Sequence, residues 1–150
     1  MYESRMNAYQ QTNVLTADPK RLVIMCYEGA ISNLKIAVKH YSAGQYEAKG
    51  KAITHAHDII SELMAALDYD KGGEIAKRLA AIYKYMLRAI IEADVRKDIG
   101  TIKDVVTMLE ELQSAWKEIF YGRKYMMHSE LAAHSSADRG EHGYSEAYGQ

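Results

Sequence analysis

The chain has a single proline, Pro19, which directly follows Asp18 and precedes a long apolar run. Aspartate is a favourable helix N-cap, and proline is accepted at the first helical position, where its missing N–H and restricted φ cost nothing. The pair therefore predicts a helix that begins at Pro19. No other proline interrupts the chain, and methionine and tyrosine are common where phenylalanine is rare. This composition favours helices with adaptable apolar surfaces.

Short turn signals divide the rest of the sequence into four long helical patterns. Turn residues occur around Gly44 and across 68–73, and Thr101 with Asp104 approximates a capping box at the start of the last pattern. The predicted helices cover about 19–41, 46–67, 74–97 and 101–121. Connections this short make neighbouring helices antiparallel. We therefore expect an all-α protein: an antiparallel four-helix bundle preceded by an N-terminal leader segment or short helix.

The length of 150 residues fits one domain with one core. We expect a leader at 1–18, the bundle at 19–122 and a tail at 123–150. The tail is rich in histidine, glycine and serine and lacks a long apolar period. It is predicted to be disordered.

The predicted helices differ in the width of their apolar faces. Apolar residues of the fourth span an arc of about 140°, which one core would occupy, whereas those of the third span about 200°. In the first helix, residues 22–27 point in every direction. Either a partner helix covers this surplus surface, or the leader covers it permanently, or the wide faces only reflect close packing.

The sequence lacks the usual catalytic and metal-binding patterns. It has no phosphate-binding glycine loop, no EF-hand and no glutamate followed three residues later by histidine. His55 and His57 are two residues apart on a helix and face different directions, so they are not expected to chelate one ion. Asp58 is expected to be solvated, and Cys26 to be a buried, inert thiol. We expect no catalytic residues, no metal and no cofactor, and hence no enzyme.

Charge and hydropathy limit the partners and the compartment. A net charge of −1 supplies no basic field for nucleic acid or an anionic membrane surface. The longest strongly apolar run, 22–27, is far shorter than the roughly 20 residues that a membrane span needs. With one cysteine and no signal peptide, the expected compartment is the cytosol, without membrane insertion.

An ordered series of short motifs carries a family resemblance. It runs through Tyr9-x4-Val14-x-Thr-Ala-x-Pro19-x2-Leu22, Tyr27-Glu-Gly-Ala30, Ala56-His-Asp-Ile-Ile-x-Glu-Leu63, Leu67-Asp68, Gly73-x-Ile-Ala-x2-Leu79, Tyr83-x-Tyr85 and Glu111-Leu-x3-Trp116. This series resembles the FliS family of flagellar secretion chaperones. The resemblance covers about four-fifths of the chain, a length on the scale of one domain.

The resemblance implies a function. Members of that family are four-helix bundles that hold the C-terminal segment of flagellin, disordered when free, in apolar grooves. It implies a type III export chaperone of the bacterial cytosol that binds flagellin one to one, prevents premature polymerisation and assists flagellar export. An export-gate component or a co-chaperone is a further candidate partner. The alternative is a non-catalytic helical-bundle interaction or regulatory protein with a different protein partner.

Angular position and the family pattern together select the expected binding residues. The N-terminal segment of the family competes with cargo, which assigns the role of a cap to Tyr9 and Val14. The expected flagellin-binding groove consists of Leu22, Met25, Ile59, Leu63, Ile75, Leu79, Ile82 and Met86. The sequence departs from the family in having Cys26-Tyr-Glu-Gly29 in place of the common Leu-Tyr-Asp-Gly. It also has Arg78 and Asp94 where asparagine is usual, which bears on polar contacts within the bundle or to cargo.

Overall fold

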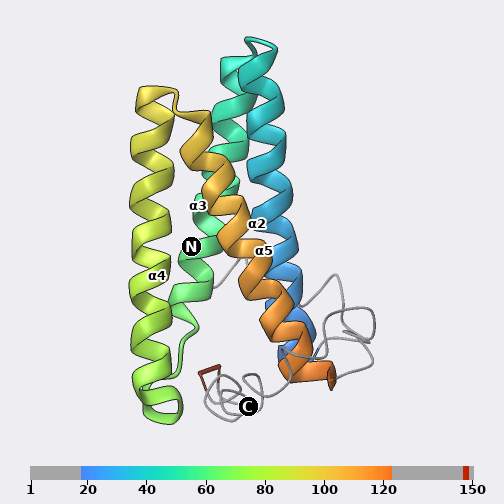
Figure 1. Cartoon of the computed structure of the whole chain (residues 1–150), viewed down its shortest axis with the longest axis vertical. Helices are drawn as coiled ribbons and strands as arrows, with labels where there is room; N and C mark the ends of the chain where they lie inside the picture. The colour runs from blue at the N-terminus through green and yellow to red at the C-terminus, as the bar shows by residue number, and fades with distance from the viewer. Residues whose placement is uncertain (1–17, 123–146, 149–150) are drawn as a thin grey trace.

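The computed structural model describes residues 18–122 and 147–148. Four helices pack side by side (Figure 1): α2 (Pro19–Ser42), α3 (Tyr46–Ala65), α4 (Tyr69–Arg96) and α5 (Ile99–Tyr121). Each packs against its neighbours in sequence, and α2 also packs against α5, so the four close around one core. The prediction of an all-α, antiparallel four-helix bundle is confirmed. The predicted leader lies outside the described residues.

Local capping explains where α2 begins and ends. The Asp18 side chain accepts a hydrogen bond from the Arg21 backbone N–H at 2.7 Å, with Pro19 in the first turn. At the other end the chain leaves the helix through Gly44, whose φ of 72° is in the left-handed region that glycine tolerates. The predicted start at Pro19 is correct, and the helix continues one residue beyond Tyr41.

The connection between α3 and α4 differs from the predicted boundaries. We expected the second helix to reach residue 67 and the third to begin at Glu74, but α3 ends at Ala65 and α4 begins at Tyr69. The Asp68 carboxylate accepts from the Lys71 N–H at 3.0 Å and stabilises an additional helical turn. That turn is separated from the rest of α4 by a kink at Gly73, with φ 51° and ψ −125°.

The predicted capping box at the start of α5 is wrong. The N-cap is Asp98, whose carboxylate accepts from the Thr101 N–H at 3.1 Å and from its hydroxyl at 2.7 Å. The Thr101 side chain therefore supports the cap from inside the helix, which starts at Ile99. Hydrogen bonds from the Thr101 hydroxyl and backbone lower the pKa of Asp98 below its ordinary value.

The core is narrower on α4 than the apolar pattern suggested. Tyr83, Met86 and Ile90 are fully buried, but Ile82 is half-buried and Ile91 is 46% exposed. The wide apolar face of this helix therefore divides into a core stripe and a margin that other helices do not cover.

The C-terminal region contributes two described residues. We expected 123–150 to be disordered, but Ala147 and Tyr148 form a turn that packs against the core, because their small and aromatic side chains find apolar partners there. Residues 123–146 and 149–150 lie outside the described part of the chain. The division into leader, bundle and tail stays a prediction.

Candidate binding site

Most of the eight predicted groove residues lie toward one end of the bundle. Seven of them occupy the first half of α2, the last half of α3 and the first half of α4, which lie at the same end because adjacent helices run in opposite directions, and Met86 lies beyond the middle of α4 (Figure 1). The predicted cap residues Tyr9 and Val14 lie outside the described residues. The helix halves that contain seven of the eight predicted groove residues lie at the lower end in Figure 1.

Burial separates these eight residues into two groups. Three are half-buried, and of these Ile75 and Ile82 pack against the core: Met25, Ile75 and Ile82. Five belong to the core itself: Leu22, Ile59, Leu63, Leu79 and Met86. Their role in binding a partner stays a prediction.

The large apolar side chains exposed on α2 and α4 are different ones. They are Ile36, Tyr69, Tyr85, Ile91 and Val95, and Val95 has the largest exposed fraction, 78%. None of these five is among the eight predicted groove residues. Angular position on a helix identifies an apolar face but not which part of that face a neighbouring helix covers.

A network of aromatic side chains crosses the same end of the bundle. The Trp116 indole donates to the Tyr27 hydroxyl at 3.1 Å, and the Tyr27 and Tyr83 hydroxyls share a hydrogen bond. The Tyr83 hydroxyl also bonds to that of Tyr148, at 2.6 Å. We call these four residues the tyrosine network. It joins α2, α4, α5 and the C-terminal region through neutral groups.

Burial controls the ionisation of this network. Burial raises the pKa of Tyr27, Tyr83 and Tyr148 well above the ordinary value for tyrosine, and electrostatic repulsion between neighbouring tyrosines is the next largest cause. The hydroxyls therefore stay protonated at neutral pH and act as hydrogen-bond donors and acceptors. They satisfy one another's hydrogen-bonding groups within an apolar environment.

Ala147 and Tyr148, which we call the tail tip, dock where α3 connects to α4. The Asp68 backbone N–H donates to the Ala147 carbonyl oxygen. A Cβ atom at Gly72 would lie 2.7 Å from the Ala147 Cα, so glycine at this position allows the close approach. The Tyr148 ring meets Trp116 edge to face, with centroids 5.2 Å apart. The bundle thus contacts the main chain and methyl group of Ala147 and the ring and hydroxyl of Tyr148.

The tail tip and its partners were not predicted as a site. Tyr27, Tyr83 and Trp116 appear in the family motifs, and a buried tyrosine or tryptophan generally requires a hydrogen-bond partner, which was the available signal. Nothing in the sequence near Tyr148 indicates docking, because its hydroxyl partner is 65 positions away. Only the packed structure brings them together.

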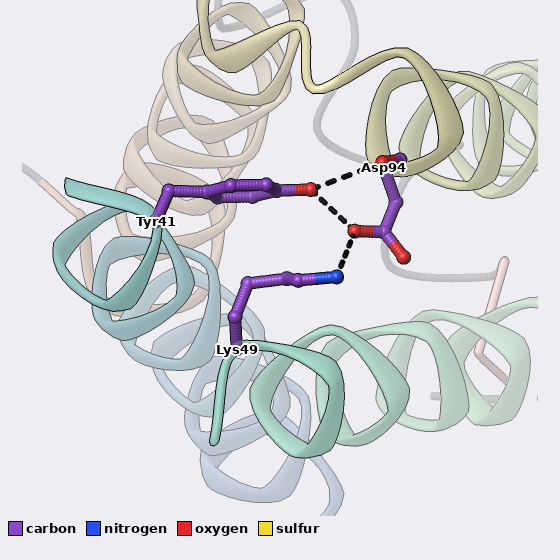
Figure 2. Close-up of polar contacts among 3 residues, drawn as sticks. All are labelled: Tyr41, Lys49 and Asp94. Carbon is purple, nitrogen blue, oxygen red and sulfur yellow. Dashed lines mark hydrogen bonds and ion pairs between the residues drawn. The ribbon is translucent and has the colours of Figure 1, made fainter. Parts of the chain in front are cut away.

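A polar cluster holds the other end of the bundle. Figure 2 shows Tyr41 of α2, Lys49 of α3 and Asp94 of α4 pointing toward one another. The Tyr41 hydroxyl and the Lys49 ammonium both donate to the Asp94 carboxylate, the latter at 2.7 Å, and the ammonium lies 5.2 Å from the Tyr41 ring centroid. We call this the Asp94 cluster. At this departure from the family pattern, the carboxylate makes contacts within the bundle.

Opposing effects set the ionisation of the Asp94 cluster. Burial by itself would raise the pKa of Asp94, but the hydrogen bonds from Lys49 and Tyr41 outweigh it and lower the pKa below its ordinary value. Burial and the hydrogen bond to Asp94 raise the pKa of Tyr41. At neutral pH Asp94 is therefore a carboxylate and Tyr41 a neutral phenol.

The other titratable residues singled out in the sequence form no reactive arrangement. Cys26 is buried, as predicted, and burial together with the nearby Glu62 raises its pKa to about 12. His55 is exposed, whereas His57 and Asp58 are half-buried. Among residues 18–122 and 147–148, no group of three histidine, cysteine or acidic side chains is placed to hold a metal ion. Over the same residues, no helix is long and apolar enough to cross a membrane.

Comparison with known proteins places this arrangement in a family. The family described as flagellar protein FliS matches residues 1–123. The chain is 39% identical over 121 residues to the flagellar secretion chaperone FliS of Salmonella typhimurium, covering 77% of this chain and 90% of that protein. It is 32% identical over 118 residues to the FliS chaperone of Vibrio cholerae, covering 76% and 87%. It is 29% identical over 121 residues to that of Bacillus subtilis, covering 81% and 90%. This chain therefore belongs to the FliS family of flagellar secretion chaperones.

Proposed function

We propose that this chain is a cytosolic chaperone that binds the C-terminal segment of flagellin, one segment per chain, and keeps it from polymerising before export. Membership in the FliS family, with a match that spans the whole bundle, is the observation that carries this proposal. The chaperone acts by binding alone, without catalysis or nucleotide.

The physical basis is apolar burial at the margin of the core. Met25, Ile75 and Ile82 are half-buried, so a partner helix can extend the apolar contact there. Each Å² of apolar surface that the partner buries contributes about 25 cal/mol. Ordering a disordered segment offsets several kcal/mol of this gain, so a large contact area remains compatible with release for export.

Calorimetric titration with a peptide spanning the last 40 or so residues of the matching flagellin tests the proposal, since this length is on the scale of coupled-folding segments. We expect saturable one-to-one binding with a negative heat-capacity change, the mark of apolar burial. Absence of binding by both calorimetry and a second method would refute it.

A matched pair of variants tests where the segment binds. Ile82→Asp places a charge at the half-buried margin and is expected to weaken binding by about tenfold or more, because the buried charge opposes apolar contact. Val95→Asp makes the same change at a position of the same helix that is 78% exposed and outside the predicted groove. Equal affinities for the two variants, both verified as folded by circular dichroism, would contradict the predicted groove.

Deletion of residues 1–15 tests the predicted cap. If Tyr9 and Val14 compete with cargo, the shortened chain binds the flagellin peptide more tightly. If the leader instead covers the bundle permanently, the shortened chain aggregates and gains no affinity, which would favour an interaction protein with a different partner.

A further inference from the structure

The tail tip lies outside the part of the chain that matches the family. The family match ends at residue 123, whereas Ala147 and Tyr148 dock on side chains inside it. The tail tip therefore lies beyond the family match and occupies a surface of the part of the chain that the match covers. That surface presents the end of the tyrosine network and the backbone of the α3–α4 connection.

The contacts define which chemistry the surface accepts. The Asp68 N–H donates to a main-chain carbonyl oxygen, so an occupant must have a carbonyl that is free to accept. An extended or turn segment has such a carbonyl, whereas those inside a helix are already paired. Gly72 leaves room for only a small side chain such as that of Ala147. Trp116 contacts an aromatic ring, and the Tyr83 hydroxyl bonds to a phenol at 2.6 Å. Together they select a small residue followed by tyrosine.

The tail tip can leave without exposing a charge or isolating a buried polar group. Its contacts to the bundle are made by neutral groups, and the Tyr83 hydroxyl retains its hydrogen bond to Tyr27 when Tyr148 departs. Another occupant with a hydroxyl, or water, then replaces the phenol. The surface is thus suited to exchange of its occupant.

The docked tail tip adjoins the predicted groove. Leu79 and Tyr83 are one turn apart on the same face of α4, beyond the kink at Gly73, and Leu79 is among the residues expected to contact flagellin. Leu79 and Tyr83 are both buried, and the Tyr83 hydroxyl bonds to Tyr148, so an apolar segment that reaches Leu79 comes next to the tail tip. A docked tail tip therefore restricts the room for that segment.

We propose that this surface is a docking site for a small residue followed by tyrosine, that the tail tip occupies it in the free chain, and that a flagellar export substrate displaces the tail tip on binding. The last step rests on the function proposed above. When the tail tip is docked the substrate cannot bind, so the apparent Kd for the substrate equals the intrinsic Kd divided by the fraction of chains in which the site is free.

Docking in the free chain is tested first, with full-length Tyr148→Ala and Tyr148→Phe. The Asp68 amide is expected to exchange its hydrogen about tenfold faster in Tyr148→Ala than in the natural chain, because it loses the Ala147 carbonyl. Trp116, the only tryptophan, is expected to change its fluorescence at the same time. Tyr148→Phe keeps the ring and should lie between the two. Tyr144→Ala, an earlier tyrosine of the same region, is the matched control. Equal Asp68 exchange in the natural chain and Tyr148→Ala would overturn the docking.

Competition is tested with the flagellin C-terminal peptide. Tyr148→Ala is expected to bind it about three- to tenfold more tightly than the natural chain or Tyr144→Ala. Saturating peptide should also bring the Asp68 exchange rate of the natural chain to that of Tyr148→Ala. If Tyr148→Ala and the natural chain bind the peptide equally well although Asp68 exchange shows the tail tip to be docked, the competition is overturned. Failure of every variant to bind the peptide would refute the proposed function and the competition with it, whereas docking would still be decided by Asp68 exchange and Trp116 fluorescence.

Discussion

The two ends of this bundle hold their helices together with different chemistry. At one end the Asp94 cluster joins three helices through a carboxylate that accepts from both Tyr41 and Lys49 (Figure 2). At the other end the tyrosine network joins α2, α4, α5 and the tail tip through hydroxyls and an indole. A tyrosine takes part in both groups, but only the Asp94 cluster contains charged side chains, and we call the two regions the charged end and the neutral end after these two groups.

This difference bears on which end can exchange a partner. Removing Lys49 or Asp94 leaves the other charge partly buried without its ion-pair partner, which is unfavourable. Exchange of a member of the Asp94 cluster for another group is therefore disfavoured. In the tyrosine network each hydroxyl both donates and accepts, and a different phenol or a water can replace the outermost member. The charged end is suited to fixing the helices, and the neutral end to binding.

The largest expected effect comes from truncating the neutral end. Trp116→Ala removes a ring that is 1% exposed and is expected to lower the free energy of unfolding by about 3–5 kcal/mol. Urea denaturation followed by circular dichroism measures the change. Tyr85→Ala removes an exposed ring from α4 and should cost far less. Similar losses in both variants would mean that the network is not a packed part of the core.

Alkaline pH is expected to destabilise the neutral end next. Burial raises the pKa of Tyr83 above its ordinary value, so its contribution is fully present below about pH 10 and is lost as the pH rises toward the folded-state pKa. Each such tyrosine contributes a slope of about 1.4 kcal/mol per pH unit. Between pH 10 and 11, where an unfolded tyrosine ionises only in part, denaturation should show a slope smaller by about 1 kcal/mol per pH unit in Tyr83→Phe. The exposed-tyrosine control Tyr46→Phe should retain the full slope.

Acid pH is expected to act on the charged end, with the opposite sign. The pKa of Asp94 is lowered in the fold, so the stability it contributes is present above its ordinary value of 3.8 and is lost as the pH falls through the folded-state pKa. Asp94→Asn should cost about 1–2 kcal/mol at pH 7 and less at pH 3. Denaturation at both pH values measures this, with the exposed Glu92→Gln as the control. If Asp94→Asn lowers the free energy of unfolding equally at both pH values, ionisation of Asp94 is not the source of the loss.

The smallest expected effects come from a pair of glycines, one near each end. Gly73, at the kink of α4, has a φ of 51°, so Gly73→Ala should destabilise by about 1 kcal/mol. Gly50, inside α3 near the Asp94 cluster, has open space where a Cβ would lie, so Gly50→Ala should stabilise by about 0.5–1 kcal/mol. Thermal unfolding of the two variants should therefore shift in opposite directions. A shift in the same direction would contradict the kink at Gly73.

Local sequence was enough to predict the helices and most of their boundaries. Asp18, Pro19 and Gly44 act through bonds and backbone angles within a few residues, so their effect is visible without the fold. The wrong start of α5 also has a local cause. Aspartate and threonine are both residue types that cap helices, and the structure shows that Asp98, not Thr101, is the N-cap. The series of motifs was likewise enough to indicate the family.

Tertiary packing was needed to separate core from margin and to locate the tail tip. The apolar pattern treats Ile82 and Met86 alike, but neighbouring helices cover only Met86 completely. Asp94 receives its partners from two other helices, and Tyr148 meets Tyr83 and Trp116 from distant parts of the chain. Helical periodicity describes directions around one axis, whereas burial and hydrogen bonding across the bundle depend on which surfaces the other helices bring near.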